Sequence, residues 1–352
     1  MNDKRVLVGL SGVVDSSVCA LLLQRQGYTV LGATLDLCDG AASGSIEDAK
    51  AVAEKLGVPF AAYNFRADFE HHVMDQFAEA YRTGRTPNPC IECNPNVKFA
   101  KMLEAADENG CEYIATGHYA RVEYDETRER WLLKKGRNLQ KDQSYVLYRL
   151  SQQQLSRTLM PLGAMESKDA IRAIAEEAGL VTARKKDSQD ICFIPDGDYT
   201  AFLQRLGVDL VPGDFVDEDG RVLGRHRGLP CYTTGQRKGL GVGGSAYPLY
   251  VLRKNAENNT VVLGPEEHLY SARLIIENAN WIAFADLTEP VRCTAKTRYS
   301  QTEAAATVSP LPDGRAEVAF DTPQRAVTAG QSAVFYDGDT VLGGGVICGG
   351  MV

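Results

Sequence analysis

The chain has 352 residues, of which 44% are hydrophobic and 24% charged, and its formal net charge is −8. This composition is typical of a globular protein with more than one domain, and it excludes a disordered chain. The acidic balance argues against a broad, non-specific nucleic-acid binder, although a local basic face still allows one folded RNA to bind. No apolar run approaches the roughly 18 residues of a membrane span or the long core of a signal peptide, so we expect a cytoplasmic protein with no membrane partner.

Strand and helix patterns alternate through residues 1–206. Strand-like runs occupy residues 4–10, 29–37, 59–65 and 111–119, and helical patterns occupy residues 16–27, 45–57 and 67–82. Such alternation predicts an α/β domain with a doubly wound parallel sheet and a ligand site at the carboxyl ends of the strands. An inserted hairpin is expected at about 120–138, followed by two amphipathic helices within 142–180, at 143–159 and 168–178.

The pattern changes after Gly207. Short alternating strands there lie between turns rich in Gly, Pro and Asn, and helical periods disappear. This pattern indicates β structure. Its length suits two small β-rich or β-barrel domains, at 207–270 and 271–352.

The stretch GLSGVVDSSV, residues 9–18, follows the first strand and opens the first helix. A Gly-rich turn at this place directs backbone N–H groups toward phosphate oxygens, and the positive end of the helix dipole assists. The hydroxyls of Ser11, Ser16 and Ser17 add donors. The turn lacks the Gly-Lys-Ser/Thr ending of a Walker loop. The alternative is an ordinary strand-to-helix turn rich in small residues.

Val13 stands where the phosphate-binding pattern Ser-Gly-Gly-x-Asp-Ser has its second glycine. If that position needs a positive φ, a β-branched residue costs on the order of 1–3 kcal/mol. Two explanations stay open, namely a loop that tolerates valine with weakened ATP affinity and a chain whose loop has lost its function.

Nine cysteines without a secretion signal indicate reduced thiols. Cys90 and Cys93 form a Cys-x-x-Cys pair after two prolines, and Cys192 lies between a charged stretch and a short apolar run. A closed zinc site would need a fourth ligand, which we do not find, so we predict no bound metal at these cysteines. The other six are expected to be packing residues: Cys19, Cys38, Cys111, Cys231, Cys293 and Cys348.

Two basic runs are candidate RNA contacts, although such runs are more often solvated surface. They are Lys134, Lys135, Arg137 and Lys141, and Arg184, Lys185 and Lys186.

Several stretches occur in the order and spacing of one family: RTPNPCIECNPNVKF, ATGHYAR, KDQSYVLY, KKDSQDICFI, GQRKGLG, CTAKTRY and GQSAVFYDG. With the loop at residues 9–18, they make the chain resemble the bacterial tRNA-specific 2-thiouridylases from end to end. The resemblance implies an adenine nucleotide alpha hydrolase-like sheet with an ATP-pyrophosphatase-type loop in 1–206.

The resemblance also implies site residues. ATP, with Mg²⁺, would be held by Gly9, Leu10, Ser11, Gly12, Val13, Val14, Asp15, Ser16, Leu35 and Gly117. The target base would lie against Asn88, Pro89 and Cys90, and tRNA would contact Lys141, Asp142, Gln143, Arg298 and Tyr299.

The implied reaction makes 2-thiouridine at the wobble position of the tRNAs that read Lys, Glu and Gln codons. ATP would adenylate the C2 oxygen of uracil, and Cys192, loaded by a persulfide sulfur donor, would deliver sulfur. Cys93 would act as nucleophile, leaving a Cys93–Cys192 disulfide for cellular thiols to reduce. Thiolates are needed, so nearby Lys185 and Lys186 are expected to lower the pKa of Cys192.

Many family members have an aspartate where Cys90 stands here. Cys90, Cys93 and Cys192 are therefore also candidates to hold an iron–sulfur cluster whose open iron carries the sulfur. Two further alternatives are a catalytically weak tRNA-binding protein, because of Val13, and another pyrophosphatase-type ligase that needs no reactive cysteines.

Overall fold

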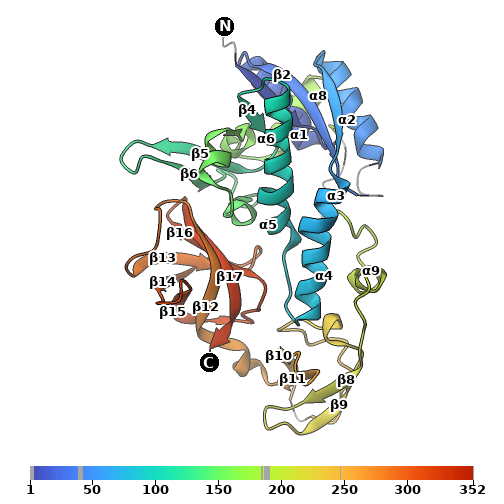
Figure 1. Ribbon diagram of the computed structural model, residues 1–352, viewed down its shortest axis with the longest axis vertical. Helices are drawn as coiled ribbons and strands as arrows, with labels where there is room; N and C mark the ends of the chain where they lie inside the picture. Colours follow the sequence, from blue (N-terminus) through green and yellow to red (C-terminus); the bar gives the residue numbers. More distant parts are fainter. Residues whose placement is uncertain (1–3, 39–42, 184, 186–190, 246, 352) are drawn as a thin grey trace.

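The structure is a computed structural model that describes residues 4–38, 43–183, 185, 191–245 and 247–351. Figure 1 shows an α/β region at the N-terminal end and two β-rich regions beneath it, with the C-terminus in one of them. The strands form a five-stranded, a four-stranded and an eight-stranded sheet. The predicted fold class is confirmed. Among the described residues, no helix is long and apolar enough to cross a membrane.

The five-stranded sheet has the order β3-β2-β1-β4-β7, and all its neighbouring pairs are parallel. Its strands are β1 (Arg5–Gly9), β2 (Thr29–Asp36), β3 (Phe60–Asn64), β4 (Tyr113–Ala115) and β7 (Thr158–Leu159). Because successive side chains of a strand point to opposite faces, Val6 and Val8 enter one hydrophobic core and Leu7 the other. The sheet is therefore buried on both faces.

Helices cover both faces of this sheet. The core with Val6 and Val8 also contains residues of α1 (Val14–Arg25), α2 (Ser43–Leu56) and α8 (Lys168–Glu177). The core with Leu7 contains Phe99, Met102 and Leu103 of α6 (Phe99–Glu108). This placement on opposite faces is the doubly wound arrangement that the sequence predicts.

The remaining helical segments of the first 206 residues are short. They are α3 (Arg66–Phe69), the π-helical η1 (Glu70–Met74), α4 (Asp75–Arg82), α5 (Pro89–Cys93), the π-helical η2 (Asn94–Lys98), the 3₁₀ turns η3 (Ser144–Leu147) and η4 (Pro161–Ala164), α7 (Gln152–Ser156) and α9 (Tyr199–Arg205). The helix predicted at 67–82 is continuous across α3, η1 and α4, with a π turn in its middle.

The helix predicted at 143–159 is wrong. This stretch holds η3, then α7, then the short strand β7. The side chain of Asn280 donates to the carbonyls of Tyr148 and Leu150, at 2.7 and 3.3 Å, and so takes acceptors that a continuous helix would use. Ser151 then begins α7 with a reciprocal capping box to Gln154. A distant side chain and a local cap together divide the segment.

The four-stranded sheet has the order β10-β11-β8-β9. Its strands are β8 (Gly213–Val216), β9 (Val222–His226), β10 (Tyr250–Asn255) and β11 (Thr260–Gly264), and η5 (Leu229–Cys231) and η6 (Glu266–Leu269) are 3₁₀ turns beside it. Phe215, Tyr232 and Val251 lie in its separate core. This small sheet occupies the lower end of the molecule in Figure 1.

The eight-stranded sheet contains a closed barrel, because β12 pairs with both β15 and β17. The barrel strands are β12 (Tyr270–Trp281), β13 (Val291–Lys296), β14 (Ala304–Pro310), β15 (Ala316–Arg325), β16 (Ser332–Asp337) and β17 (Thr340–Met351). The predicted hairpin is β5 (Ala120–Asp125) and β6 (Arg130–Lys135), and β6 pairs with β17 through Lys134 and Thr340. The hairpin thus joins the first region to the barrel.

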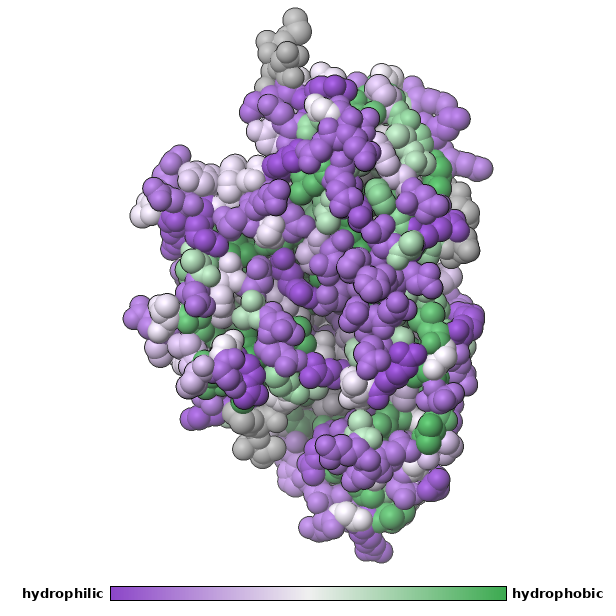
Figure 2. All heavy atoms as spheres, in the orientation of Figure 1, coloured by the Kyte–Doolittle hydropathy of each residue, from purple (hydrophilic) through white to green (hydrophobic). Residues whose placement is uncertain are grey.

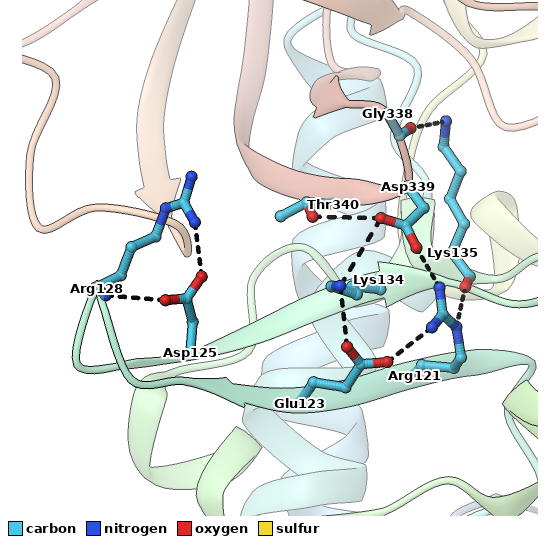
Figure 3. Close-up of polar contacts among 9 residues, drawn as sticks. All are labelled: Arg121, Glu123, Asp125, Arg128, Lys134, Lys135, Gly338, Asp339 and Thr340. Atoms are coloured by element: carbon cyan, nitrogen blue, oxygen red, sulfur yellow. Dashed lines mark hydrogen bonds and ion pairs between the residues drawn. The ribbon is translucent and has the colours of Figure 1, made fainter.

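An ion-pair network holds this junction (Figure 3). Arg121 pairs with Glu123 at 2.7 Å and with Asp339 of the β16–β17 turn. Lys134 pairs with Glu123 at 2.9 Å and with Asp339 at 3.9 Å. Lys135 pairs with Glu303 of the barrel at 2.6 Å. Two cations of the first basic run are therefore neutralised by carboxylates within the protein.

The predicted domain limits at 206 and 270 stay predictions. On the face shown in Figure 2, polar side chains cover most of the surface and the apolar patches are small and scattered.

Candidate active site

The predicted phosphate loop joins β1 to α1, and hydrogen bonds fix its shape. The N–H of Leu10 donates to the carbonyl of Ala33 at 2.7 Å, which holds the loop to β2. The hydroxyl of Ser16 accepts from the N–H of Ser11 at 3.1 Å and donates to the carbonyl of Val13. At the start of α1, no side chain caps the first N–H groups. Donors at this end are thus available to an anion.

Val13 carries no backbone strain. Its φ is −122° and its ψ 165°, an extended conformation that β-branched residues readily adopt. The left-handed residue of the loop is Gly12, with φ +67°. Position 13 therefore does not need the positive φ on which the expected strain depends, and the effect of valine is limited to its side chain, which lines the cleft described below.

Asp15, in the first turn of α1, is held by two side chains. Lys168 Nζ lies 2.8 and 2.7 Å from its two carboxylate oxygens, and Tyr119 donates its hydroxyl to Oδ1 at 2.6 Å. The side chains of Lys168 and Asp15 are only 13% and 22% exposed. Gly117 packs so closely here that an added Cβ would lie 3.0 Å from the backbone of Asp15 and Ser16. The turn at Thr116, Gly117 and His118 therefore packs directly against the loop and supports its conformation.

A cleft of about 760 Å³ opens at the carboxyl ends of the parallel strands. It brings together predicted residues from distant parts of the chain. These are Gly9, Leu10, Ser11, Val13, Asp15, Ser16, Leu35, Gly117, Pro89, Cys90, Cys93, Lys141, Gln143, Cys192 and Tyr299. The loop, the three singled-out thiols and most of the predicted RNA contacts thus face one cavity.

Five predicted residues do not line this cleft: Gly12, Val14, Asn88, Asp142 and Arg298. Val14 is buried in the core, and Asn88 caps α5 by accepting from the N–H of Cys90 at 3.2 Å. Asp142 accepts from the N–H groups of Gly136 and Ser144, and burial raises its pKa.

Arg298 lies between the two β-rich regions. Its Nη2 donates to the carbonyls of Thr234 and Ala326, each at 3.0 Å, and to the hydroxyl of Thr328 at 2.6 Å. Burial lowers its pKa, and its buried Nε has no hydrogen-bond partner. These contacts give Arg298 a structural role at this junction, while its contact with tRNA stays a prediction.

Cys93 ends α5 and is 8% exposed. Burial raises the pKa of its thiol to about 11, against the opposing effect of the Lys98 ammonium and a hydrogen bond from the Lys98 backbone. Cys192 is exposed at the rim of the cleft, yet desolvation by its surroundings raises its pKa to about 12. Both thiols are therefore protonated at neutral pH before substrates bind.

Among the described residues, Lys98 is a cation near both thiols. Its charge opposes the raised pKa values of both Cys93 and Cys192. Lys185 instead donates to the carbonyl of Gly12 at 3.1 Å and pairs with Asp48, so its predicted effect on Cys192 is wrong. Lys186 and Arg184 lie outside the described residues.

Cys38 corrects another expectation. It follows β2 and lines the same cleft as Cys90, Cys93 and Cys192, rather than serving only as packing. It also packs against the apolar cluster that contains Cys93 and Phe193, as does Ile191, the other neighbour of Cys192. The cleft thus holds one more thiol than the sequence predicts.

Lys168, Tyr119 and Lys98 are further site residues that we did not predict. Tyr119 and Lys98 belong to the motifs ATGHYAR and NPNVKF, so both carried a signal. Lys168 begins an ordinary helix pattern, and no motif in the sequence marks it as a site residue. Within the described residues, no group of three or more His, Cys, Asp or Glu side chains is arranged to hold a metal ion.

Comparison with known proteins shows similarity along the whole chain. Residues 4–196 match a tRNA methyl transferase HUP domain, residues 200–265 a tRNA methyl transferase PRC-barrel domain, and residues 271–347 an aminomethyltransferase beta-barrel domain. A tRNA-specific 2-thiouridylase of Acetivibrio thermocellus is 51% identical over 99% of this chain and 100% of its own length. Those of Caldanaerobacter subterraneus and Clostridioides difficile are 49% and 46% identical, each over 98% of both chains.

Proposed function

The chain belongs to the tRNA-specific 2-thiouridylase family, and from that membership we propose that it replaces the C2 oxygen of the wobble uridine with sulfur in an ATP-dependent reaction. The observation that carries the proposal is one cleft lined by the phosphate loop, Cys93 and Cys192. Activation of an oxygen and delivery of sulfur need those groups within reach of a single base.

We propose that the loop binds the phosphates of ATP during adenylation. The N–H groups at the start of α1 and the hydroxyl of Ser11 are donors for phosphate oxygens, and the loop faces the cleft. Mg²⁺ bound to the phosphates would neutralise charge on the leaving pyrophosphate. Among the described residues that line the cleft, Asp15 is the carboxylate that would share it, although Lys168 and Tyr119 already hold that group. Leu35 and Gly117 would flank the nucleotide.

Sulfur delivery follows from the two thiols. A persulfide on Cys192, which is exposed and open to a donor protein, attacks C2 of the adenylated base, and AMP leaves. The Cys93 thiolate then attacks Cys192 Sγ, so the terminal sulfur stays on the base and a Cys93–Cys192 disulfide forms. The Lys98 charge favours the Cys93 thiolate that this step needs.

We propose that tRNA approaches the same cleft. Lys141, Gln143 and Tyr299 line it, and the Tyr299 ring is 42% exposed and so accessible for stacking on a base. Extrusion of the uridine from the anticodon stack would bring it against Pro89 and Cys90. A cytoplasmic location fits a tRNA substrate, and a persulfide-carrying protein is the expected sulfur donor.

The residues present do not fit an iron–sulfur cluster. Such a cluster needs thiolates that converge on one point, whereas Cys90, Cys93 and Cys192 do not form a metal-holding group in the described part of the chain. We derive no step through it.

The test is mass analysis of tRNA nucleosides after incubation with ATP, Mg²⁺ and glutathione persulfide. We expect 2-thiouridine from the unaltered protein and none from Cys93→Ser or Cys192→Ser. Activity that survives both substitutions would point to a ligase without reactive cysteines. AMP release without thiolation would isolate a defect in sulfur delivery, and tRNA binding with neither product would identify a binding protein.

Val13→Gly is the companion variant. Because Val13 is unstrained, the substitution relieves nothing in the backbone, and we expect the KM for ATP to change by less than about three-fold. Gly12→Val, at φ +67°, is expected to raise that KM strongly. A large gain of activity in Val13→Gly would show that the side chain blocks the phosphates.

A further inference from the structure

The proposed reaction leaves a Cys93–Cys192 disulfide, in which Cys93 is poorly accessible to solvent. Cys93 is 8% exposed and lies in an apolar cluster with Phe69, Val97 and Phe193. A thiol can attack this disulfide only at the exposed Cys192 Sγ, because access limits thiol–disulfide exchange. Release of Cys93 after every turnover therefore needs a thiol that is close to Cys192.

Cys38 is placed for that step. It lines the cleft with Cys93 and Cys192, and it packs against the cluster that contains Cys93 and Phe193, the residue after Cys192. The pKa of Cys192 is raised first by desolvation and then by the nearby Cys93, Cys38 and Cys90. Cys38 is partly exposed, whereas Cys93 is buried.

We propose that Cys38 is a third reacting thiol of this site, which resolves the Cys93–Cys192 disulfide by thiol–disulfide exchange. The inference rests on the proposed function. The Cys38 thiolate attacks Cys192 Sγ, a Cys38–Cys192 bond forms, and the Cys93–Cys192 bond breaks. Cys93 leaves as a thiolate and takes up the proton that Cys38 lost. The exchange consumes no oxidant or reductant.

The direction of the exchange follows from the environment of Cys93. Burial raises the pKa of this thiol to about 11, so Cys93 takes up a proton once it is released and is then a poor nucleophile for the reverse attack on Cys192 Sγ. The disulfide then moves to two thiols that both reach the surface, where a soluble thiol such as glutathione completes the reduction.

The first experiment tests whether the Cys38 and Cys192 thiols can come into contact in the absence of the reaction. Cys93→Ser is equilibrated in a glutathione redox buffer, quenched with N-ethylmaleimide and mapped by mass spectrometry of non-reduced peptides. We expect a Cys38–Cys192 disulfide, which the double variant Cys93→Ser/Cys38→Ser cannot form. If Cys192 is found only as a mixed disulfide with glutathione, the proposal is overturned.

The second experiment follows the full reaction with tRNA, ATP, Mg²⁺ and glutathione persulfide. We expect the Cys93–Cys192 peptide to appear with 2-thiouridine and then to convert to the Cys38–Cys192 peptide. In Cys38→Ser the first disulfide should persist, and turnover at limiting glutathione should fall by at least about ten-fold, since an intramolecular thiol outcompetes a dilute one. Cys348→Ser, altered in β17 outside the cleft, is the matched control and should behave as the unaltered chain.

The two proposals fail differently. If 2-thiouridine forms while Cys38 is alkylated in full at every time point, the third thiol is refuted and the proposed function stands. If the unaltered protein makes no 2-thiouridine under any of these conditions, the proposed function fails first.

Discussion

Lys254 of β10 carries a charge in a nearly closed environment. Its Nζ lies 3.4 Å from the hydroxyl oxygen of Thr86 and 5.7 Å from the ring centroid of Tyr81. In the part of the chain that the structure describes, no carboxylate pairs with it. Burial lowers the pKa of Lys254 from its usual 10.5 to about 8.

Replacement of Lys254 by Met should therefore stabilise the protein. The lowered pKa corresponds to a cost of about 3 kcal/mol for the charged form in the fold. Methionine keeps the volume and loses a cation–π contact of about 1 kcal/mol, so the net gain at pH 7 is about 2 kcal/mol. The unfolded chain retains the proton up to pH 10.5, so the stability of the unaltered protein rises between pH 8 and 10.5. The gain should therefore shrink to about 1 kcal/mol or less at pH 9.5.

The assay is urea unfolding followed by circular dichroism at pH 7 and pH 9.5, with a reductant present. Lys238→Met is the matched control, because Lys238 is exposed in the same part of the chain and should change the midpoint little. A Lys254→Met protein that is less stable at pH 7, or whose advantage is the same at both pH values, would refute the reasoning.

Three further predictions concern the cleft. Gly117→Ala places a Cβ 3.0 Å from the loop backbone, so the KM for ATP should rise about ten-fold, whereas Gly243→Ala, with nothing within 4 Å, should leave it unchanged. Lys168→Met removes the ion pair with Asp15 and should lower the free energy of unfolding by about 2 kcal/mol in urea; an unchanged midpoint would contradict this. Burial raises the pKa of Cys192 to about 12, so its mapped alkylation by iodoacetamide should rise about ten-fold per pH unit from pH 7, and a plateau below pH 9 would disagree.

Local patterns predicted most of the parallel sheet. The runs at β1, β2 and β3 are apolar and bounded by turn residues, so their strands are readable from short windows. The strand β7 spans only Thr158–Leu159 and has no pattern of its own. The false helix at 143–159 arose because periodicity cannot reveal Asn280, which lies more than 100 residues away and takes the carbonyls of Tyr148 and Leu150.

Those site residues that lie within recognisable sequence motifs could be predicted. The loop and the pair Cys93 and Cys192 lie in strings that the sequence alone singles out. Cys38 has no such string, and only the fold brings it to the cleft. Sequence proximity suggests Lys185 and Lys186 as the cations that lower the pKa of Cys192, whereas the described cation that opposes the raised pKa of both thiols is Lys98 at the end of η2.

The apolar core on one side of the parallel sheet does not stop at the predicted boundary near 206. Tyr145 and Tyr148 share it with Val334 and Tyr336 of the barrel, and both tyrosine hydroxyls bond to Ser332, at 2.8 and 3.0 Å. A fragment cut at that boundary would leave two large aromatic side chains in water with their hydroxyl partners gone. Cutting the chain at that boundary should therefore yield an aggregating first piece, because the surface that the barrel covers becomes an exposed apolar patch.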